Sequence, residues 1–147
     1  MNRIKNVVTS LVVCLSLLTI AAIPVMAATS SWSMIMGTNG RIIDGSKNSV
    51  YHELDAGTAK ITGTIKTISN TGLSGETNTL YISLYNKSSG SCYGTVSVKP
   101  SAVVNGTVSV SGTFSENVVA GKKYYLKIYR ANSDGTYLNG SGTLKNK

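Results

Sequence analysis

The sequence predicts an all-β protein that folds as an antiparallel sandwich of two β-sheets. Runs of alternating apolar and polar residues recur along the chain, and no stretch of useful length shows the period of an amphipathic helix. Short polar turns separate these runs. Several turns contain an Asn-Gly or Asp-Gly pair: Asn39-Gly40, Asp44-Gly45, Asn105-Gly106 and Asp134-Gly135. About eight short strands at this spacing are typical of a jelly-roll or immunoglobulin-like sandwich, and a closed barrel is the alternative.

The clearest strand lies within the segment 118–130, VVAGKKYYLKIYR, where a glycine turn is followed by alternating side chains. Successive side chains of a strand point to opposite faces of its sheet. One set is expected to face the core: Tyr124, Leu126 and Ile128. The other set is expected to face solvent: Tyr125, Lys127 and Tyr129.

Turn residues delimit the other expected strands. The first strand alternates at three apolar positions: Trp32, Met34 and Met36. Asn39-Gly40 then predicts a tight hairpin turn into the second strand. Further strands are expected at residues 41–43, 50–54, 59–68, 80–85, 93–99, 107–114 and 136–144. Ile68 breaks the alternation of its strand, which indicates a β-bulge or a strand end. Residues 69–78 combine glycine with small polar side chains and predict the longest loop.

Residues 1–27 have the pattern of a secretory signal peptide. Two basic residues, Arg3 and Lys5, precede a long apolar run, and the segment ends on the small residue Ala27, after which we expect cleavage. The remaining residues 28–147 then form one domain of about 120 residues, secreted and without a membrane span. A retained membrane anchor is the alternative, because the apolar run is nearly long enough to cross a bilayer.

The chain is basic, with a formal net charge of +8 at pH 7. Such a balance favours contact with anionic polymers or lipid headgroups. The lysines are scattered along the sequence, however, and nucleic-acid binding usually needs a clustered basic face. A nucleic-acid partner is therefore not expected.

Few side chains could catalyse a reaction or bind a metal. His52 is the only histidine, and alternation places the nearby Glu53 and Asp55 on the opposite face of its strand. After cleavage Cys92 is the only cysteine, and its spacing from Val96 predicts a buried, unreactive thiol. One histidine and one cysteine cannot form a standard zinc site, and the acidic residues lie at or near turns. No catalytic residue, metal ligand or cofactor is predicted.

Three segments resemble bacterial pre-peptidase C-terminal domains in their order along the chain. They are VYHELDAGTAKI at 50–61, TLYISLYN at 79–86 and VVAGKKYYLKIY at 118–129. The resemblance implies a β-sandwich of the kind attached to secreted peptidases, where such domains help to bind insoluble substrates or aid secretion. That family usually carries aspartates before its D-L-Y-type strand, whereas Asn78 and Thr79 stand there in this chain, so no calcium site or functional residue is transferred.

The candidate ligand site consists of aromatic residues on two expected strands, at 80–85 and within 118–130. The tyrosines of each strand fall on the face opposite its apolar set. If the two strands are neighbours, the candidate residues form one exposed stripe: Tyr81, Tyr85, Tyr125, Lys127 and Tyr129. Flat aromatic rings with hydroxyl groups suit sugar rings and protein partners alike. Alternatively, cross-strand tyrosine pairs only stabilise the open face of the sheet.

Together these features predict a secreted, non-enzymatic β-sandwich that binds a partner at or outside the cell envelope. The expected partner is a cell-wall polysaccharide or an extracellular protein. The main alternative is a secreted antagonist, either a peptidase inhibitor or a bacteriocin-like toxin, that acts through loops. A small hydrolase is the least favoured class, because one histidine shows no converging catalytic constellation.

Overall fold

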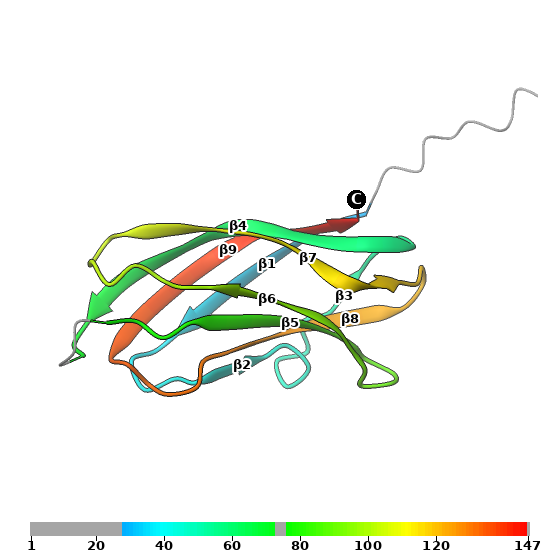
Figure 1. Ribbon diagram of the computed structural model, residues 1–147. Helices are drawn as coiled ribbons and strands as arrows, with labels where there is room; N and C mark the ends of the chain where they lie inside the picture. The colour runs from blue at the N-terminus through cyan, green and yellow to red at the C-terminus, as the bar shows by residue number, and fades with distance from the viewer. Residues whose placement is uncertain (1–27, 73–75, 147) are drawn as a thin grey trace, which may run out of the picture.

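The chain forms two antiparallel β-sheets packed face to face, as the sequence predicts (Figure 1). The computed structural model describes residues 28–72 and 76–146, and these residues form nine β-strands and no helix. The expected signal peptide, residues 1–27, lies outside the described residues. In the described ranges, no helix has the length and apolar character needed to cross a membrane.

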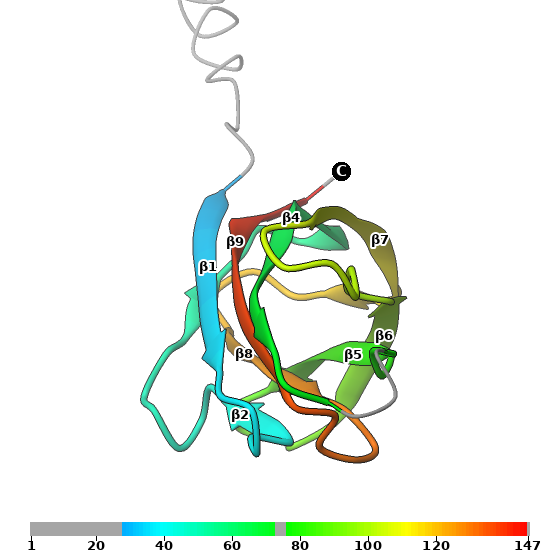
Figure 2. The same cartoon turned by 90° about the vertical axis from the view of Figure 1, so that its left-hand side faces the viewer.

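Sheet A contains four strands, in the order β1, β9, β4 and β7. They span Thr29–Met36 in β1, Thr136–Asn146 in β9, Gly57–Asn70 in β4 and Thr107–Val118 in β7. β1 is an edge strand whose hydrogen-bonded neighbour in the sheet is β9, the last strand of the chain. The two ends of the described chain therefore lie side by side (Figure 2).

Sheet B has the order β2, β8, β5 and β6, and a short strand β3 also pairs with β8. The strands span Ile42–Asp44 in β2, Lys123–Tyr129 in β8, Leu80–Asn86 in β5, Cys92–Val98 in β6 and His52–Glu53 in β3. Most successive strands alternate between the two sheets, and this strand order is that of a jelly roll. The structure is thus the jelly-roll form of the predicted sandwich.

The predicted turns occur where the sequence places them, but most do not form hairpins within one sheet. At Asn39-Gly40, the N–H of Gly40 donates to the carbonyl of Gly37 at 2.9 Å, which makes a tight turn. The strands on either side, β1 and β2, belong to different sheets, so the predicted hairpin is wrong. Asp134-Gly135 likewise leads from β8 in sheet B to β9 in sheet A. A tight turn reverses the chain, but the packing of the apolar faces decides which strand becomes the hydrogen-bonded neighbour.

Several strand boundaries differ from the prediction: β1 begins at Thr29, β7 extends to Val118 and β9 to Asn146. The expected strand at 50–54 is reduced to His52–Glu53, and β4 extends two residues into the expected loop at 69–78. Residues 73–75 of that loop lie outside the described residues. The irregularity expected at Ile68 is confirmed, because the register of β4 against β9 shifts at this residue.

The core lies between the sheets and follows the predicted alternation. The buried apolar and aromatic side chains of β8 and β5 are Tyr124, Leu126, Ile128, Leu80, Ile82 and Leu84. Tyr124 is the largest of these, and its ring meets Tyr93 edge-on with the centroids 5.2 Å apart. Its hydroxyl accepts a hydrogen bond from the N–H of Val119 at 2.8 Å. A buried tyrosine thus keeps its polar atom paired and fixes the connection between β7 and β8.

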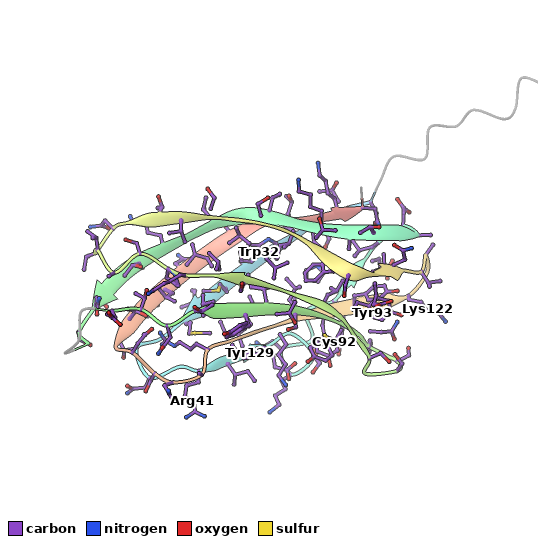
Figure 3. The ribbon with its side chains drawn as sticks, in the orientation of Figure 1. Trp32, Arg41, Cys92, Tyr93, Lys122 and Tyr129 are labelled. Carbon is purple, nitrogen blue, oxygen red and sulfur yellow. The ribbon has the colours of Figure 1, made fainter. Side chains whose placement is uncertain are left out.

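Trp32 packs across the inner face of sheet A, over positions where the neighbouring strands carry glycine. The register places Trp32 of β1 beside Gly142 of β9, which in turn pairs with Gly63 of β4. A Cβ atom at Gly63 would lie 2.7 Å from Cζ2 of the indole, closer than real atoms approach. The indole Nε1 donates to the carbonyl of Thr62 at 3.0 Å. Figure 3 shows the ring between the two layers. Glycine is therefore required so that one large side chain can fill the space above three strands.

Candidate ligand-binding face

The predicted aromatic stripe forms on the outer face of sheet B, because β5 and β8 are neighbours. Tyr81 lies opposite Tyr129, and Tyr85 lies opposite Tyr125. The ring centroids are 5.3 Å apart in the first pair and 5.4 Å in the second, with interplanar angles of 24° and 14°. Both pairs are stacked. The tyrosine face, defined as Tyr81, Tyr85, Tyr125, Lys127 and Tyr129, is thus a continuous surface on two strands.

A polar row separates the two tyrosine pairs. Lys127 lies opposite Ser83, and Ser83 lies opposite Thr95 of β6. The Oγ of Ser83 is 2.7 Å from Oγ1 of Thr95, so these hydroxyls hydrogen-bond to each other. The ammonium of Lys127 is 5.9 Å from the ring centroid of Tyr85, within the range of a cation–π interaction. Along the direction of the strands, one tyrosine pair is therefore followed by a polar row and then by the second tyrosine pair.

The tyrosine face is less open than the sequence suggests. Tyr81 is 37% exposed, whereas the other three tyrosines are half-buried, because each ring covers part of its partner. Burial, together with the neighbouring Cys92, raises the pKa of Tyr85 above its usual 10.0. Its hydroxyl is therefore neutral at physiological pH and can both donate and accept hydrogen bonds.

A depression of about 320 Å³ lies at the β2 side of the tyrosine face. Its lining consists of Arg41, Ile42, Tyr85, Lys127, Tyr129 and Arg130. Ile42 lies opposite Tyr129 in the sheet and is 54% exposed. Arg41 extends away from the sandwich beside β2 (Figure 3). The depression is within the size range of small-ligand sites. The sequence does not single out Arg41 or Ile42, because nothing in it shows that β2 borders β8.

Cys92 is exposed, so the prediction of a buried thiol is wrong. The prediction assumed unbroken alternation from Cys92 to Val96. Gly94 interrupts it with a φ of +128°, and the register of β6 against β5 shifts between Ser83 and Tyr85. Such a bulge turns the residues before it to the other face. Cys92 consequently lies opposite Tyr85, at the border of the tyrosine face.

We expect Cys92 of the native protein to react with a thiol reagent at a rate close to that of the unfolded protein, because the residue is exposed. The measurement is the kinetics of 5,5′-dithiobis(2-nitrobenzoate) labelling with and without denaturant. Cys92→Ser is the control for reaction elsewhere. Labelling that requires denaturant would restore the buried assignment.

His52 is buried and joins the two sheets. Its side chain is 2% exposed, and Nδ1 lies 2.8 Å from Oγ of Ser30 on β1. Burial lowers the pKa of His52 below its usual 6.5. Asp55, the nearby carboxylate, accepts instead a hydrogen bond from the N–H of Ala28. Among the described residues, no three acidic, histidine or cysteine side chains are grouped so that they could hold a metal ion. This arrangement is that of a structural histidine.

The free energy of unfolding is expected to fall as the pH drops from 7.5 to 5. The unfolded chain takes up a proton at His52 near pH 6.5, whereas the buried ring resists protonation. The loss cannot exceed about 1.4 kcal/mol per pH unit. Asp44 and Asp134 have pKa values lowered from 3.8, so they act only at more acidic pH. Denaturant unfolding at several pH values tests this, with His52→Gln as the variant that should lose the dependence. An equal decline in both proteins would contradict the assignment.

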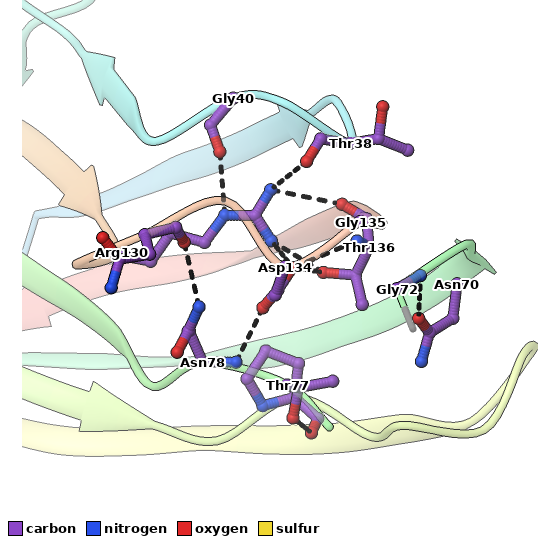
Figure 4. A network of polar contacts seen from close by, with 12 residues as sticks. Thr38, Gly40, Asn70, Gly72, Thr77, Asn78, Arg130, Asp134, Gly135 and Thr136 are labelled. Atoms are coloured by element: carbon purple, nitrogen blue, oxygen red, sulfur yellow. Dashed lines mark hydrogen bonds and ion pairs between the residues drawn. The ribbon is translucent and has the colours of Figure 1, made fainter. Parts of the chain in front are cut away.

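A buried ion pair lies where β8 leads to β9, and sequence reasoning missed it (Figure 4). The Arg130 side chain is fully buried, and its Nη1 contacts the Asp134 carboxylate. Three guanidinium bonds reach the β1–β2 connection, to the carbonyls of Gly40 at 2.8 Å, Gly37 at 2.9 Å and Thr38 at 3.1 Å. Arg130 continues the inward set of its strand, and that alternation is the signal that could have identified it.

Asp134 is more than the turn residue that the sequence suggests. Burial alone would raise its pKa, but hydrogen bonds from the backbone N–H of Asn78 and from Thr136, with the charge of Arg130, lower it. The Asn78 bond is 2.6 Å long. The carboxylate therefore remains ionised and ties the segment before β5 to the β8–β9 connection. Because Arg130 is neutralised in this way, it contributes little positive charge to the depression that it lines.

No protein-family model and no curated protein matches the chain. Among solved structures, it is similar to the carbohydrate-binding module CBM6cm-2 from Cellvibrio mixtus lichenase 5A in complex with cellotriose. The TM-score is 0.45 and the identity 12%, over 82% of this chain and 86% of that chain. It is also similar to CsCBM6-3 from Clostridium stercorarium in complex with cellobiose, with a TM-score of 0.43 and 17% identity over 80% and 86% of the two chains. The core of the Drosophila protein NLP, described for pentamer formation and histone binding, gives a TM-score of 0.35 and 8% identity over 82% and 98%. Likeness at this level assigns no function.

Proposed function

We propose that this protein is a secreted, non-enzymatic binding module that recognises a polysaccharide through the tyrosine face. The observation that carries the proposal is the pair of stacked tyrosine couples on either side of a polar row. The couples are four residues apart along each strand, which corresponds to roughly 13 Å at the usual strand rise. A surface of this length can contact several units of an extended polymer.

The chemistry of the face suits sugars. Sugar rings have apolar C–H faces that pack on aromatic rings, and their hydroxyls need hydrogen-bond partners. The four tyrosine rings supply the packing surface, and the phenol groups, Lys127 and the exposed hydroxyl of Thr95 supply hydrogen-bond partners. Ser83 itself is buried and bonds to Thr95 from beneath. Stacking already holds the rings in place, so binding orders few side chains and loses little conformational entropy.

A second candidate, a secreted antagonist that acts through loops, is favoured by the connection between β6 and β7. Val103 is 70% exposed there, and the adjacent Val104 is exposed as well. Two neighbouring apolar side chains at a loop tip can insert into a partner protein. An antagonist of this kind would inhibit a peptidase, would lose that activity in the Val103→Ser, Val104→Ser variant, and would keep it when the tyrosines are changed.

The test of the polysaccharide proposal is retention on insoluble polysaccharides and cell-wall fractions. Tyr85→Ala and Tyr129→Ala are each expected to weaken retention about tenfold, because stacking on one ring is lost. Tyr137→Ala is the matched control, because Tyr137 is a half-buried tyrosine on β9 of the other sheet. Equal retention of all three variants would contradict the proposal, and so would a lack of retention on every polymer.

A stability measurement separates lost binding from lost folding. The tyrosine variants should unfold with a free energy only about 0.5–1.5 kcal/mol below that of the parent, the usual contribution of an aromatic pair. The buried neighbours Leu126 and Ile128 should each lose about 2–5 kcal/mol on replacement by alanine. If the tyrosine variants prove as unstable as these, the tyrosines are core residues and reduced retention says nothing about a binding site.

A further inference from the structure

Two of the cations that line the depression beside the tyrosine face form no ion pair within the described part of the chain. These cations are Arg41 and Lys127. Among the described residues, Lys123 pairs with Glu53 and Arg130 with Asp134, whereas neither Arg41 nor Lys127 lies within ion-pair distance of an acidic side chain. An arginine can contact a carboxylate through two parallel hydrogen bonds, and a lysine adds a point charge.

Asp44 is the carboxylate nearest to these cations along the sheet. It lies opposite Lys127 in the register of β2 and β8. Its Oδ1 accepts hydrogen bonds from the hydroxyl of Ser46 at 2.7 Å and from the Ser46 N–H at 3.0 Å. These bonds, and to a smaller degree the charge of Lys127, lower the pKa of Asp44. The carboxylate is thus ionised and held by Ser46 through Oδ1, and its single negative charge offsets only one of the two positive charges.

We infer that the ligand of the tyrosine face is an acidic polysaccharide, whose carboxylate contacts Arg41 and Lys127 while a sugar ring packs on Tyr129. This inference rests on the proposed function and adds the chemical class of the ligand. A nucleic acid fits less well, because it needs basic side chains that follow the phosphate backbone for several nucleotides. Here two cations lie in one place, between aromatic rings.

The experiment compares acidic polysaccharides with their own methyl esters, which have the same backbone without the charge. Polygalacturonate, alginate and hyaluronan are the acidic probes, and affinity electrophoresis gives the dissociation constants. We expect the acidic forms to bind at least tenfold more tightly than the esters. Arg41→Gln combined with Lys127→Met should reduce that preference about tenfold. The matched control combines Lys66→Met with Lys145→Met, which removes the same charge from exposed positions on sheet A.

The outcomes distinguish this inference from the proposed function. If esters and acids bind equally and only the tyrosine variants lose binding, the acidic ligand is excluded while the polysaccharide module stands. If the control variant loses as much affinity as the Arg41, Lys127 variant, binding follows net charge and the inference is wrong. Tighter binding of single-stranded DNA than of every polysaccharide overturns both.

A second, independent observation concerns the start of the described chain. The backbone nitrogen of Ala28 donates to Oδ2 of Asp55 at 2.6 Å, just before β1 begins at Thr29. Asp55 lies between β3 and β4, so the contact joins the start of an edge strand to another part of the sandwich. Ala28 is also the residue at which the sequence predicts the mature chain to start.

We propose that signal cleavage turns this contact into an ion pair between the Ala28 α-ammonium and Asp55. Hydrolysis of the Ala27–Ala28 bond leaves a carboxylate on Ala27. The Ala28 nitrogen gains a hydrogen from water and takes up a further proton. A charge-assisted bond to a carboxylate is roughly twice as strong as one between neutral groups. Removal of the signal segment would thereby complete the attachment of β1 to the rest of the sandwich. The ion pair would form only if cleavage leaves Ala28 as the first residue, because Ala28 carries the nitrogen that contacts Asp55.

The test uses protein exported from the full-length chain, whose N-terminus is first read by mass spectrometry. Acetylation near pH 6.5 modifies the α-amine in preference to lysines. We expect acetylation to lower the Tm of the parent by about 3 °C, and to have little effect in Asp55→Asn. The α-amine of the parent should also react more slowly than that of this variant.

Glu53→Gln is the matched control, because it removes a nearby exposed carboxylate that pairs with Lys123 instead. Acetylation should lower the Tm of the control by as much as that of the parent. Equal shifts in the parent and in Asp55→Asn would overturn the proposal, as would a mature chain that starts at any other residue.

Discussion

Replacement of Arg130 by methionine is expected to lower the free energy of unfolding by about 3–5 kcal/mol. Methionine fills much of the same space, but it leaves the Asp134 carboxylate buried without its counter-charge. The carbonyls of Thr38 and Gly40 lose the Arg130 donor at the same time, and the carbonyl of Gly37 keeps only its bond from the Gly40 N–H. An unpaired buried charge is among the few defects that destabilise a domain to this degree.

The measurement is denaturant unfolding followed by the emission of the single tryptophan. Arg41→Met is the control, because Arg41 is exposed, and it should change the free energy by no more than about 0.5 kcal/mol. Adding Asp134→Asn to Arg130→Met should recover part of the loss by removing the unpaired charge. Similar stabilities for the Arg130 and Arg41 variants would show that the ion pair contributes nothing.

Replacement of Trp32 by alanine should be about as severe, with a loss of about 3–5 kcal/mol. The indole lies above Gly142 and Gly63 on the two neighbouring strands, and these two positions have no side chains to fill the cavity. The carbonyl of Thr62 also loses a hydrogen bond. Because this variant lacks the only tryptophan, its unfolding is followed by far-ultraviolet circular dichroism instead of fluorescence.

Ile35→Ala on the same strand is the control, because Ile35 is 64% exposed and should matter little. Gly63→Ala tests the same packing from the opposite side. Its methyl group would collide with the indole and with the backbone carbonyl of Ser141, at a cost of about 1–3 kcal/mol. A stable Trp32→Ala protein would mean that the core closes over the vacancy.

Alternation predicted the parts of the fold that depend only on a strand's own side chains. In β8 and β5 it correctly separated the apolar set and Tyr124, which are buried, from the four tyrosines of the tyrosine face, because each strand is regular along its whole length. The same reasoning failed at Cys92, because a single residue with positive φ, Gly94, reverses the direction of the side chains before it. A bulge of this kind depends on how two strands pair, and that is not visible in one strand.

The part of the candidate site on β5 and β8 was predictable, because both strands alternate clearly in sequence. The part contributed by β2 was not, because it depends on which strands are neighbours in the sheet. The tyrosine pairs followed once β5 and β8 were assumed to be neighbours, and the register confirms that assumption. Arg41 and Ile42 could not be added, because the Asn39-Gly40 turn suggested a hairpin rather than a passage between sheets. Arg130 was overlooked because an inward-facing arginine is an exception to the pattern that identifies core residues.

The pairing of β1 with β9 has a consequence for the timing of folding. Sheet A cannot acquire its edge strand until the last residues of the chain are available, since every β1 partner lies between Leu138 and Lys145. Contacts between the two ends of a sequence form slowly, because bringing the ends together costs the entropy of closing a long loop. If the chain crosses a membrane N-terminus first, as its leading segment predicts, β1 emerges long before its partner. The protein would then remain incompletely folded during transport, in the state that a narrow export channel requires, and would close only after its C-terminus had passed.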